Sequence, residues 1–160
     1  MKVAVTPPKL DQIYDTATEI DVMIAMRDGV RLASDVHRPA HEGVFASGAF
    51  PVLVERTPYG KNNETVRERT AHDPRPMRRE EVAAYFVRHG YVVVIQDLRG
   101  RDRSEGRFTK YLGEAQDGYD TLAWIAKQPW CNGRIGTYGL SYAAHTQTAL
   151  ASARPPGLSA

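Results

Sequence analysis

The sequence predicts an α/β fold in which an antiparallel hairpin begins a mostly parallel sheet. Segments with strand and helix patterns alternate along the chain after residue 50, as they do in parallel sheets with right-handed crossovers. Residues 91–96 (YVVVIQ) also form a continuous apolar and β-branched run, which is typical of a strand covered on both faces. A chain of 160 residues is long enough for one domain with a core. We expect residues 1–18 to be an N-terminal extension and residues 19–160 to form that domain.

The first predicted strands form the hairpin. Ile20, Val22 and Ile24 alternate with polar or smaller residues, residues 27–29 (RDG) supply turn chemistry, and residues 30–36 lead out again. After the hairpin, two loop-like segments flank a short apolar, β-branched one. They predict a loop over 39–50, a strand over 51–56 and a polar surface excursion over 62–78.

Helical periodicity predicts the remaining elements. The first helix covers residues 79–88, with Val82, Tyr85 and Phe86 on its apolar face and Gly90 as its C-terminal stop. After the strand over 91–96, the pattern predicts a helix over 115–127, a strand over 134–138 and an alanine-rich helix over 142–153.

Composition and charge narrow the classes of function. Apolar residues make up 42% of the chain and charged residues 25%, as in ordinary soluble globular proteins. The formal net charge of +2 favours neither nucleic acid nor a membrane surface as a partner. The arginines of residues 99–107 lack the interleaved aromatic side chains of an RNA-binding surface. No apolar run is long enough to span a bilayer, the chain begins without an apolar signal segment, and we expect a cytoplasmic protein.

Residues 139–143 (GLSYA) have the pattern of a nucleophile elbow between a predicted strand and a predicted helix. This turn holds its serine in strained dihedral angles, so strand and helix approach closely and the neighbouring residues must be small. Gly136, Gly139, Ala143 and Ala144 meet that need. The five-residue pattern alone is weak, and a tight turn with an incidental serine is the alternative.

The motifs around this turn resemble those of the cocaine-esterase-like and X-Pro dipeptidyl-peptidase-like hydrolases. Residues 116–147 follow that family's pattern of D-G-x-D, W-I, Q-P-W, N-G-x-x-G and G-x-S-Y. Three earlier segments also resemble the family in the expected order: residues 26–32 (MRDGVRL), 56–59 (RTPY) and 96–106 (QDLRGRDRSEG). The resemblance covers most of the chain from about residue 19 and implies an α/β-hydrolase fold, truncated after the helix that follows the nucleophile.

The resemblance also implies catalytic roles for three residues. Ser141 is the nucleophile that forms an acyl-enzyme, and the backbone N–H of Tyr142 and the hydroxyl of Tyr59 hold the oxyanion. Two positions depart from the family pattern. Ala144 replaces a glycine, adding one methyl group that we expect to lie against the sheet, and Asp102 replaces the second glycine of the R-G-x-G segment, where it can adopt a left-handed conformation.

The catalytic acid and histidine follow the serine in this fold. His145 is one helical turn beyond Ser141 and is expected to point away from its oxygen, as a packing or surface histidine. Asp117 and Asp120 precede the serine and are expected to be structural. We therefore expect the acid and base to lie beyond Ala160, together with a cap and a C-terminal β-sandwich, and this chain alone to be inactive.

The leading hypothesis is a cofactor-free serine hydrolase of small-molecule esters, amides or peptides. The family includes carboxylesterases, α-amino-acid ester hydrolases, acylases and X-Pro peptidases, and the sequence does not choose among them, although ester or acyl hydrolysis is favoured. The alternative is a non-catalytic remnant, or a binding module that a partner completes. Cys131 is the single cysteine, so no disulfide and no zinc site are expected, and the oligomeric state stays open.

Overall fold

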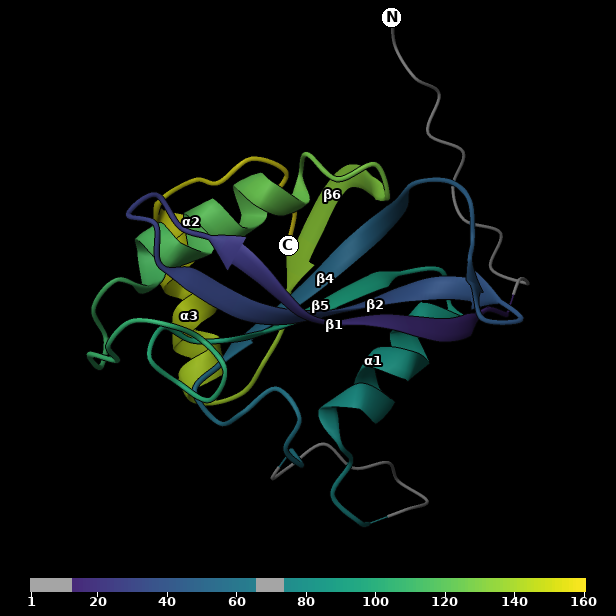
Figure 1. Ribbon diagram of the computed structural model, residues 1–160, viewed down its shortest axis with the longest axis horizontal. Helices are drawn as coiled ribbons and strands as arrows, with labels where there is room; N and C mark the ends of the chain where they lie inside the picture. The colour runs from purple at the N-terminus through teal and green to yellow at the C-terminus, as the bar shows by residue number, and fades with distance from the viewer. Residues whose placement is uncertain (1–12, 66–73) are drawn as a thin grey trace, which may run out of the picture.

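A single twisted sheet with helices on both faces forms the core of the molecule (Figure 1). The computed structural model describes residues 13–65 and 74–160. The elements in chain order are β1 (Asp15–Ala25), β2 (Arg31–His41), β3 (Val44–Phe45), β4 (Phe50–Thr57), α1 (Arg79–Arg88), β5 (Val92–Asp97), α2 (Glu114–Ile125), β6 (Cys131–Thr137) and α3 (Tyr142–Ser152).

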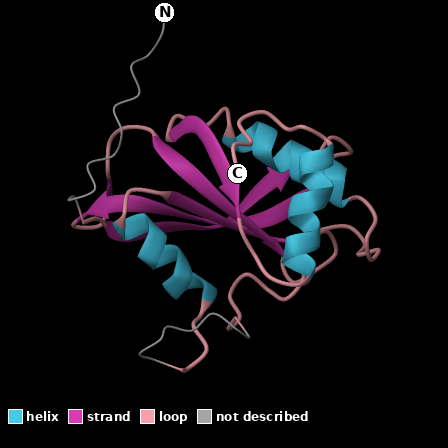
Figure 2. Cartoon of the chain, turned by 180° about the vertical axis from the view of Figure 1, so that it is seen from behind, coloured by secondary structure: helices cyan, strands magenta, loops and turns pink. Residues whose placement is uncertain are grey.

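The strand order is β1-β2-β5-β4-β6, with the short β3 paired to β2. The strands β5, β4 and β6 are parallel, whereas β2 is antiparallel to both β1 and β5. This is the predicted arrangement, in which an antiparallel hairpin adjoins parallel strands. Helix α1 lies on one face of the sheet, and α2 and α3 lie on the other (Figures 1 and 2).

Strand β5 shows how the sheet is buried on both sides. All six of its residues are buried, and its side chains point alternately to the two faces. Val93 and Ile95 pack with Ala83 and Val87 of α1. Val92 and Val94 belong to the larger cluster on the opposite face, which includes residues of α2 and α3. The apolar run that predicted a doubly covered strand is therefore confirmed.

The N-terminal hairpin begins earlier and reaches further than predicted. Strand β1 starts at Asp15, so the last four residues of the expected extension belong to it, and residues 1–12 lie outside the described part. The loop predicted over 39–50 contains the end of β2 and the short β3. A tight turn joins them, because Glu42 and Gly43 both have positive φ angles, 51° and 78°. Glu-Gly is not one of the usual dipeptides for such a turn, so this turn was not predicted.

Helix α1 has the predicted bounds, but its buried face differs from the prediction. Val82, Ala83 and Val87 are buried, whereas Tyr85 is 60% exposed. The small side chain of Ala83 lets the helix lie close to β5, which turns Tyr85 outward. The ring of Tyr85 then packs on that of Phe86 at 5.4 Å between centroids.

The C-terminal segment pairs with the sheet. The carbonyl of Gly157 accepts a hydrogen bond from the N–H of Ile135, and the N–H of Ser159 donates to the carbonyl of Ile135. Leu158 forms a parallel bridge to Ile135. These residues therefore run parallel to β6 and extend the hydrogen bonding of the sheet beyond that strand.

Candidate active site

Ser141 occupies a sharp turn between β6 and α3. Its dihedral angles are φ 61° and ψ −120°, outside the regions that non-glycine residues favour. Gly139 has φ 137°, and a Cβ atom there would lie 2.6 Å from the Cβ of Ala143. The geometry of the elbow therefore requires the glycine at 139 and a small side chain at Ala143. Ala144 is exposed, so its extra methyl group faces outward and does not lie against the sheet as expected.

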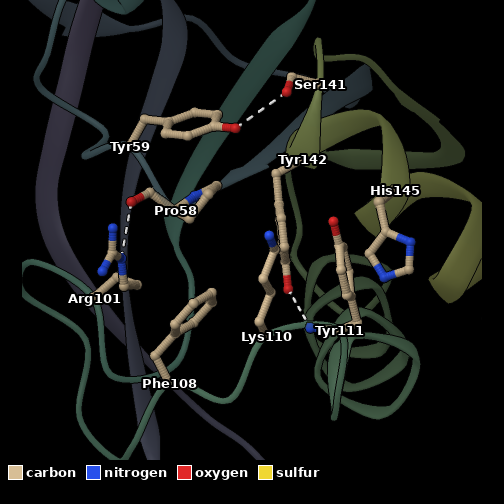
Figure 3. Close-up of a pocket in the computed structure, with 9 residues that line it drawn as sticks. All are labelled: Pro58, Tyr59, Arg101, Phe108, Lys110, Tyr111, Ser141, Tyr142 and His145. Carbon is tan, nitrogen blue, oxygen red and sulfur yellow. Dashed lines mark hydrogen bonds between the residues drawn. The ribbon is translucent and has the colours of Figure 1, made fainter.

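Tyr59 reaches the serine from the loop after β4. Its hydroxyl lies 3.2 Å from Ser141 Oγ (Figure 3). Strands β4 and β6 are parallel neighbours, so their carboxyl ends meet at one edge of the sheet, where such folds place their active sites. The sequence placed Tyr59 here only through the family resemblance.

Hydrogen bonds to its main chain hold the Tyr59 loop in place. The carbonyl of Pro58 accepts a bond from Arg101 Nε at 3.0 Å, and the carbonyl of Tyr59 accepts one from Asn63 Nδ2 at 2.6 Å. The N–H of Tyr59 donates to Thr57 Oγ1 at 3.1 Å. These bonds fix the loop on both sides of the tyrosine, so its ring is aimed at the serine before any substrate binds.

Tyr142 contributes to the site through its backbone. It is the first residue of α3, and the first N–H groups of a helix have no partner within the helix. Its side chain points into the protein, where the hydroxyl accepts a hydrogen bond from the N–H of Tyr111 and donates one to Glu114 Oε1. Its ring stacks on that of Tyr111 with centroids 5.2 Å apart, and burial raises the pKa of the Tyr142 phenol.

A buried charge pair lies beneath the elbow. Arg56, 1% exposed, donates from Nε to Gln96 Oε1 at 2.8 Å and from Nη1 to the backbone carbonyl of Glu114 at 3.0 Å. Its guanidinium also pairs with the Glu114 carboxylate at 3.4 Å. Burial raises the pKa of Glu114, and the positive charge of Arg56 opposes that rise. Thr146 donates to the carbonyl of Arg56, which ties α3 to β4.

The other motif residues of the family pattern have structural roles. Asp97 accepts hydrogen bonds from the N–H groups of Lys61 and Arg103, which joins the loops after β4 and β5. Asp117 pairs with Arg99 at 2.6 Å.

The D-G-x-D segment of α2 is built for packing. Asp120 pairs with Arg27 of the first hairpin at 2.8 Å. A Cβ atom on Gly118 would lie 2.4 Å from the Cβ of Leu150, so glycine allows α2 to pack closely on α3. The interpretation of Asp117 and Asp120 as structural agrees with these contacts.

A pocket of about 510 Å³ opens beside Ser141 (Figure 3). Four aromatic rings and one proline line it, namely Tyr59, Phe108, Tyr111, Tyr142 and Pro58. The remaining lining residues are Arg101, Lys110, Ser141 and His145. The loop over 98–113 supplies four of the nine lining residues, which were not predicted as part of the site: Arg101, Phe108, Lys110 and Tyr111. The one available signal was that this loop follows the carboxyl end of a predicted parallel strand.

His145 faces this pocket but is not bonded to the nucleophile. Its ring packs edge-on against Tyr111, with centroids 4.8 Å apart, and against Tyr142 at 5.5 Å. In the described part of the chain, its imidazole makes no hydrogen bond to Ser141, and Nε2 is buried without a hydrogen-bond partner. The ring packing is the role expected for His145, whereas its place in the lining of the pocket beside Ser141 was not expected.

Residues 13–65 and 74–160 contain no group of three or more His, Cys, Asp or Glu side chains placed to hold a metal ion. Cys131 is half-buried, and burial raises the pKa of its thiol. None of the helices in this part of the chain is long and apolar enough to cross a membrane.

Comparison with known proteins assigns the family. The family model described as X-Pro dipeptidyl-peptidase (S15 family) matches residues 28–160. The chain belongs to the S15 family. The cocaine esterase of Rhodococcus sp. (strain MB1 Bresler) is 40% identical over 151 residues, which cover 94% of this chain and 24% of that protein.

Solved structures of similar proteins confirm the α/β-hydrolase fold. A CocE/NonD family hydrolase from Staphylococcus aureus matches with a TM-score of 0.71 at 33% identity, over 89% of this chain and 26% of that one. An α-amino acid ester hydrolase matches with a TM-score of 0.69 at 29% identity, over 98% of this chain and 26% of that one. This S15 chain therefore spans about a quarter of the length of these three proteins.

Proposed function

We propose that Ser141, Tyr59 and Tyr142 supply the nucleophile and the oxyanion hole of a serine hydrolase. This enzyme cleaves ester or amide bonds through an acyl-enzyme. The observation that supports this most directly is the 3.2 Å approach of the Tyr59 hydroxyl to Ser141 Oγ, at a turn where the serine has φ 61°. The S15 family match and the esterase among its relatives support the same reaction class.

In the proposed reaction, Ser141 Oγ attacks the acyl carbonyl carbon and loses its proton to a base. The carbonyl oxygen becomes an oxyanion, which the backbone N–H of Tyr142 and the hydroxyl of Tyr59 stabilise. The bond to the leaving alcohol or amine then breaks, the leaving group takes a proton, and an acyl-enzyme remains. Water hydrolyses this ester and regenerates the serine hydroxyl.

The resting contact between Tyr59 and Ser141 suits this role. A phenol 3.2 Å from the nucleophile is close to the place where the oxyanion forms when the serine bonds to the carbonyl carbon. The phenol proton then bonds to the new oxyanion in place of the serine oxygen. Because the loop is already held by Arg101 and Asn63, this donor needs little reorganisation.

We further propose that the acid and the base lie beyond residue 160, with the cap and the C-terminal β-sandwich, and that residues 19–160 are the first part of the catalytic domain. The length of the relatives supports this division. We also propose a cytoplasmic location and small-molecule esters, amides or peptides as substrates. No separate observation favours a non-catalytic binding module.

The test uses the protein expressed from its full reading frame and 4-nitrophenyl butanoate as substrate. Ser141→Ala is expected to lower kcat by roughly 10⁴-fold or more, because the nucleophile is removed. Ser152→Ala, an exposed serine at the other end of α3, is the matched control and should keep the parental rate. A Ser141→Ala variant that keeps the parental kcat would overturn the proposal.

A further inference from the structure

The charges that line the pocket beside Ser141 are all of one sign. Arg101 and Lys110 line it, and no aspartate or glutamate is among its described lining residues. Both cations come from the loop between β5 and α2. An uncompensated positive field in a hollow next to a nucleophile attracts anions and raises their local concentration.

Arg101 is held in a fixed orientation at this wall. Its Nε donates to the carbonyl of Pro58 at 3.0 Å, and its guanidinium carbon lies 5.0 Å from the centre of the Phe108 ring. Among the described residues, its terminal amino groups form no ion pair and no hydrogen bond. A guanidinium fixed through Nε and a ring contact presents its remaining donors with little further loss of entropy.

Lys110 is the second cation of the wall. Its ammonium lies 4.9 Å from the centre of the Tyr111 ring, a contact between a cation and an aromatic face. In the described part of the chain, this ammonium has no carboxylate within ion-pair distance. The Tyr111 ring and the Lys110 ammonium together suit a ligand that has an apolar part and a negatively charged group.

Three carboxylates in or beside this loop form ion pairs with other arginines. Glu105 pairs with Arg31, Glu114 with Arg56, and Asp117 with Arg99. Asp102 lines a separate hollow with Gly60 and Lys61. Within residues 13–65 and 74–160, no carboxylate pairs with Arg101 or Lys110, so the positive charge of the pocket wall is not neutralised by an ion pair there.

We propose that the substrate of this site carries a carboxylate, which Arg101 and Lys110 bind while the adjoining rings contact the apolar part of the molecule. The inference rests on the proposed function and adds the substrate class to it. The reaction is the same hydrolysis, in which the carboxylate stays intact and only fixes the orientation. Charge-assisted hydrogen bonds from a fixed guanidinium are stronger and more directional than neutral ones.

Two pairs of ester probes test the proposal in the protein expressed from its full reading frame. In the first pair, the acyl group differs, 4-nitrophenyl glutarate against 4-nitrophenyl pentanoate. In the second, the leaving group differs, 4-butanoyloxybenzoate against 4-butanoyloxybenzamide. Each kcat/KM is divided by the spontaneous hydrolysis rate of that ester. The anionic member of at least one pair is expected to be preferred by about tenfold at low salt, and added NaCl should reduce the preference.

Substitutions at the two cations show whether they cause the preference. Lys110→Gln and Arg101→Gln should each lower the ratio of anionic to neutral kcat/KM by about threefold to tenfold, the range of one or two charge-assisted contacts. Arg101→Lys keeps the positive charge but loses the Nε donor to the Pro58 carbonyl. It should retain the preference for the anionic ester, which shows that the charge and not this hydrogen bond causes the preference. Arg134→Gln, at an exposed arginine of β6 outside the pocket, should leave the ratio unchanged.

The possible failures are distinguishable. If hydrolysis depends on Ser141 but neither anionic probe is preferred, the inference is wrong and the proposed function stands. The same holds if the preference is present and survives in the Arg101→Gln, Lys110→Gln double variant. If Ser141→Ala hydrolyses all four probes at the parental rate, the proposed function fails, and the inference fails with it.

Discussion

The hydroxyl of Tyr59 lies 3.2 Å from Ser141 Oγ, although 82 residues separate the two in sequence. The parallel pairing of β4 with β6 produces this proximity. Val54 is opposite Thr137 in the register, so the chain leaves both strands at the same edge and each residue is reached within a few positions. Two loops that follow adjacent strands thus bring a nucleophile and a hydrogen-bond donor together.

Removal of the Tyr59 hydroxyl tests its role as an oxyanion donor. Tyr59→Phe in the protein expressed from its full reading frame should lower kcat by about 10²–10³-fold, because one fixed donor is lost in the transition state. KM should change little. Tyr85→Phe, which removes an exposed hydroxyl from α1, is the control. An unchanged kcat in Tyr59→Phe would remove Tyr59 from the oxyanion site.

Gly139→Ala should distort the elbow. The new Cβ would lie 2.6 Å from that of Ala143 at φ 137°, so strand and helix must separate. We expect a loss of about 2 kcal/mol or more in the free energy of unfolding, and loss of most activity. Gly133→Ala is the matched control, because Gly133 also has a positive φ, 86°, but open space at its Cβ position.

Urea denaturation and ester hydrolysis together measure this effect. The Gly133→Ala control should lose about 1 kcal/mol of unfolding free energy from its left-handed backbone conformation alone, and it should keep its activity. Equal losses of stability and activity in the two variants would show that close packing at Gly139 is not needed for the elbow.

Arg56→Ala should be among the most destabilising substitutions in this part of the protein. It leaves the buried carboxyl of Glu114 without its charge partner, and broken buried pairs cost about 3–5 kcal/mol. Arg27→Ala breaks an exposed pair with Asp120, in which the arginine is 52% exposed, and should cost much less. The urea midpoints of the two variants, compared with that of the parent, measure the difference. Equal shifts would contradict a supporting role for the buried pair.

The buried imidazole of His37 should make the folded protein less stable in acid. Its ring is buried beside Thr18, and burial lowers the pKa of the imidazole, with Asp35 and Glu80 opposing and Lys61 adding to that shift. A lowered folded pKa means that the unfolded chain binds the proton more readily. The contribution of neutral His37 to the free energy of unfolding is therefore complete above pH about 6.5, the histidine pKa in the unfolded chain. It is lost as the pH falls toward the lower pKa of the folded state.

Melting temperatures at pH 7.5 and pH 5.5 test this prediction. His37→Gln should lose less stability between the two pH values than the parent does. His89→Gln, at an exposed histidine that directly follows α1, should show the parental loss. If His37→Gln loses as much stability as the parent, the burial of His37 does not contribute to the acid sensitivity.

Local patterns predicted most of the fold. The 3.6-residue period and the stop at Gly90 placed α1 at its observed bounds, and the β-branched run over 91–96 placed β5 within one residue. The turn at Glu42 was missed because its residue type rarely adopts a left-handed conformation. The exposure of Tyr85 was missed because the small side chain of Ala83, not the larger aromatic ring, decides how the helix lies on the sheet.

Less of the site than of the fold could be predicted from local sequence patterns. The elbow pattern indicated Ser141, since the constraints of that turn are local, and the family resemblance implied its role as nucleophile. The pairing of Tyr59 with Ser141 depends on β4 lying next to β6, and no local pattern encodes strand order, so only the family resemblance placed it. Arg101 and Lys110 lie in a loop without periodicity, and their position beside the nucleophile follows only from the tertiary structure.

The most direct test of the central proposal is covalent trapping of the nucleophile. The protein expressed from its full reading frame is treated with a fluorophosphonate, which reacts with activated serines, and the modified peptide is identified by mass spectrometry. We expect one label, on Ser141, a matching loss of esterase activity, and no label in Ser141→Ala. An active enzyme that is labelled at another residue, or whose Ser141→Ala variant is labelled and inhibited as the parent is, would contradict Ser141 as the nucleophile.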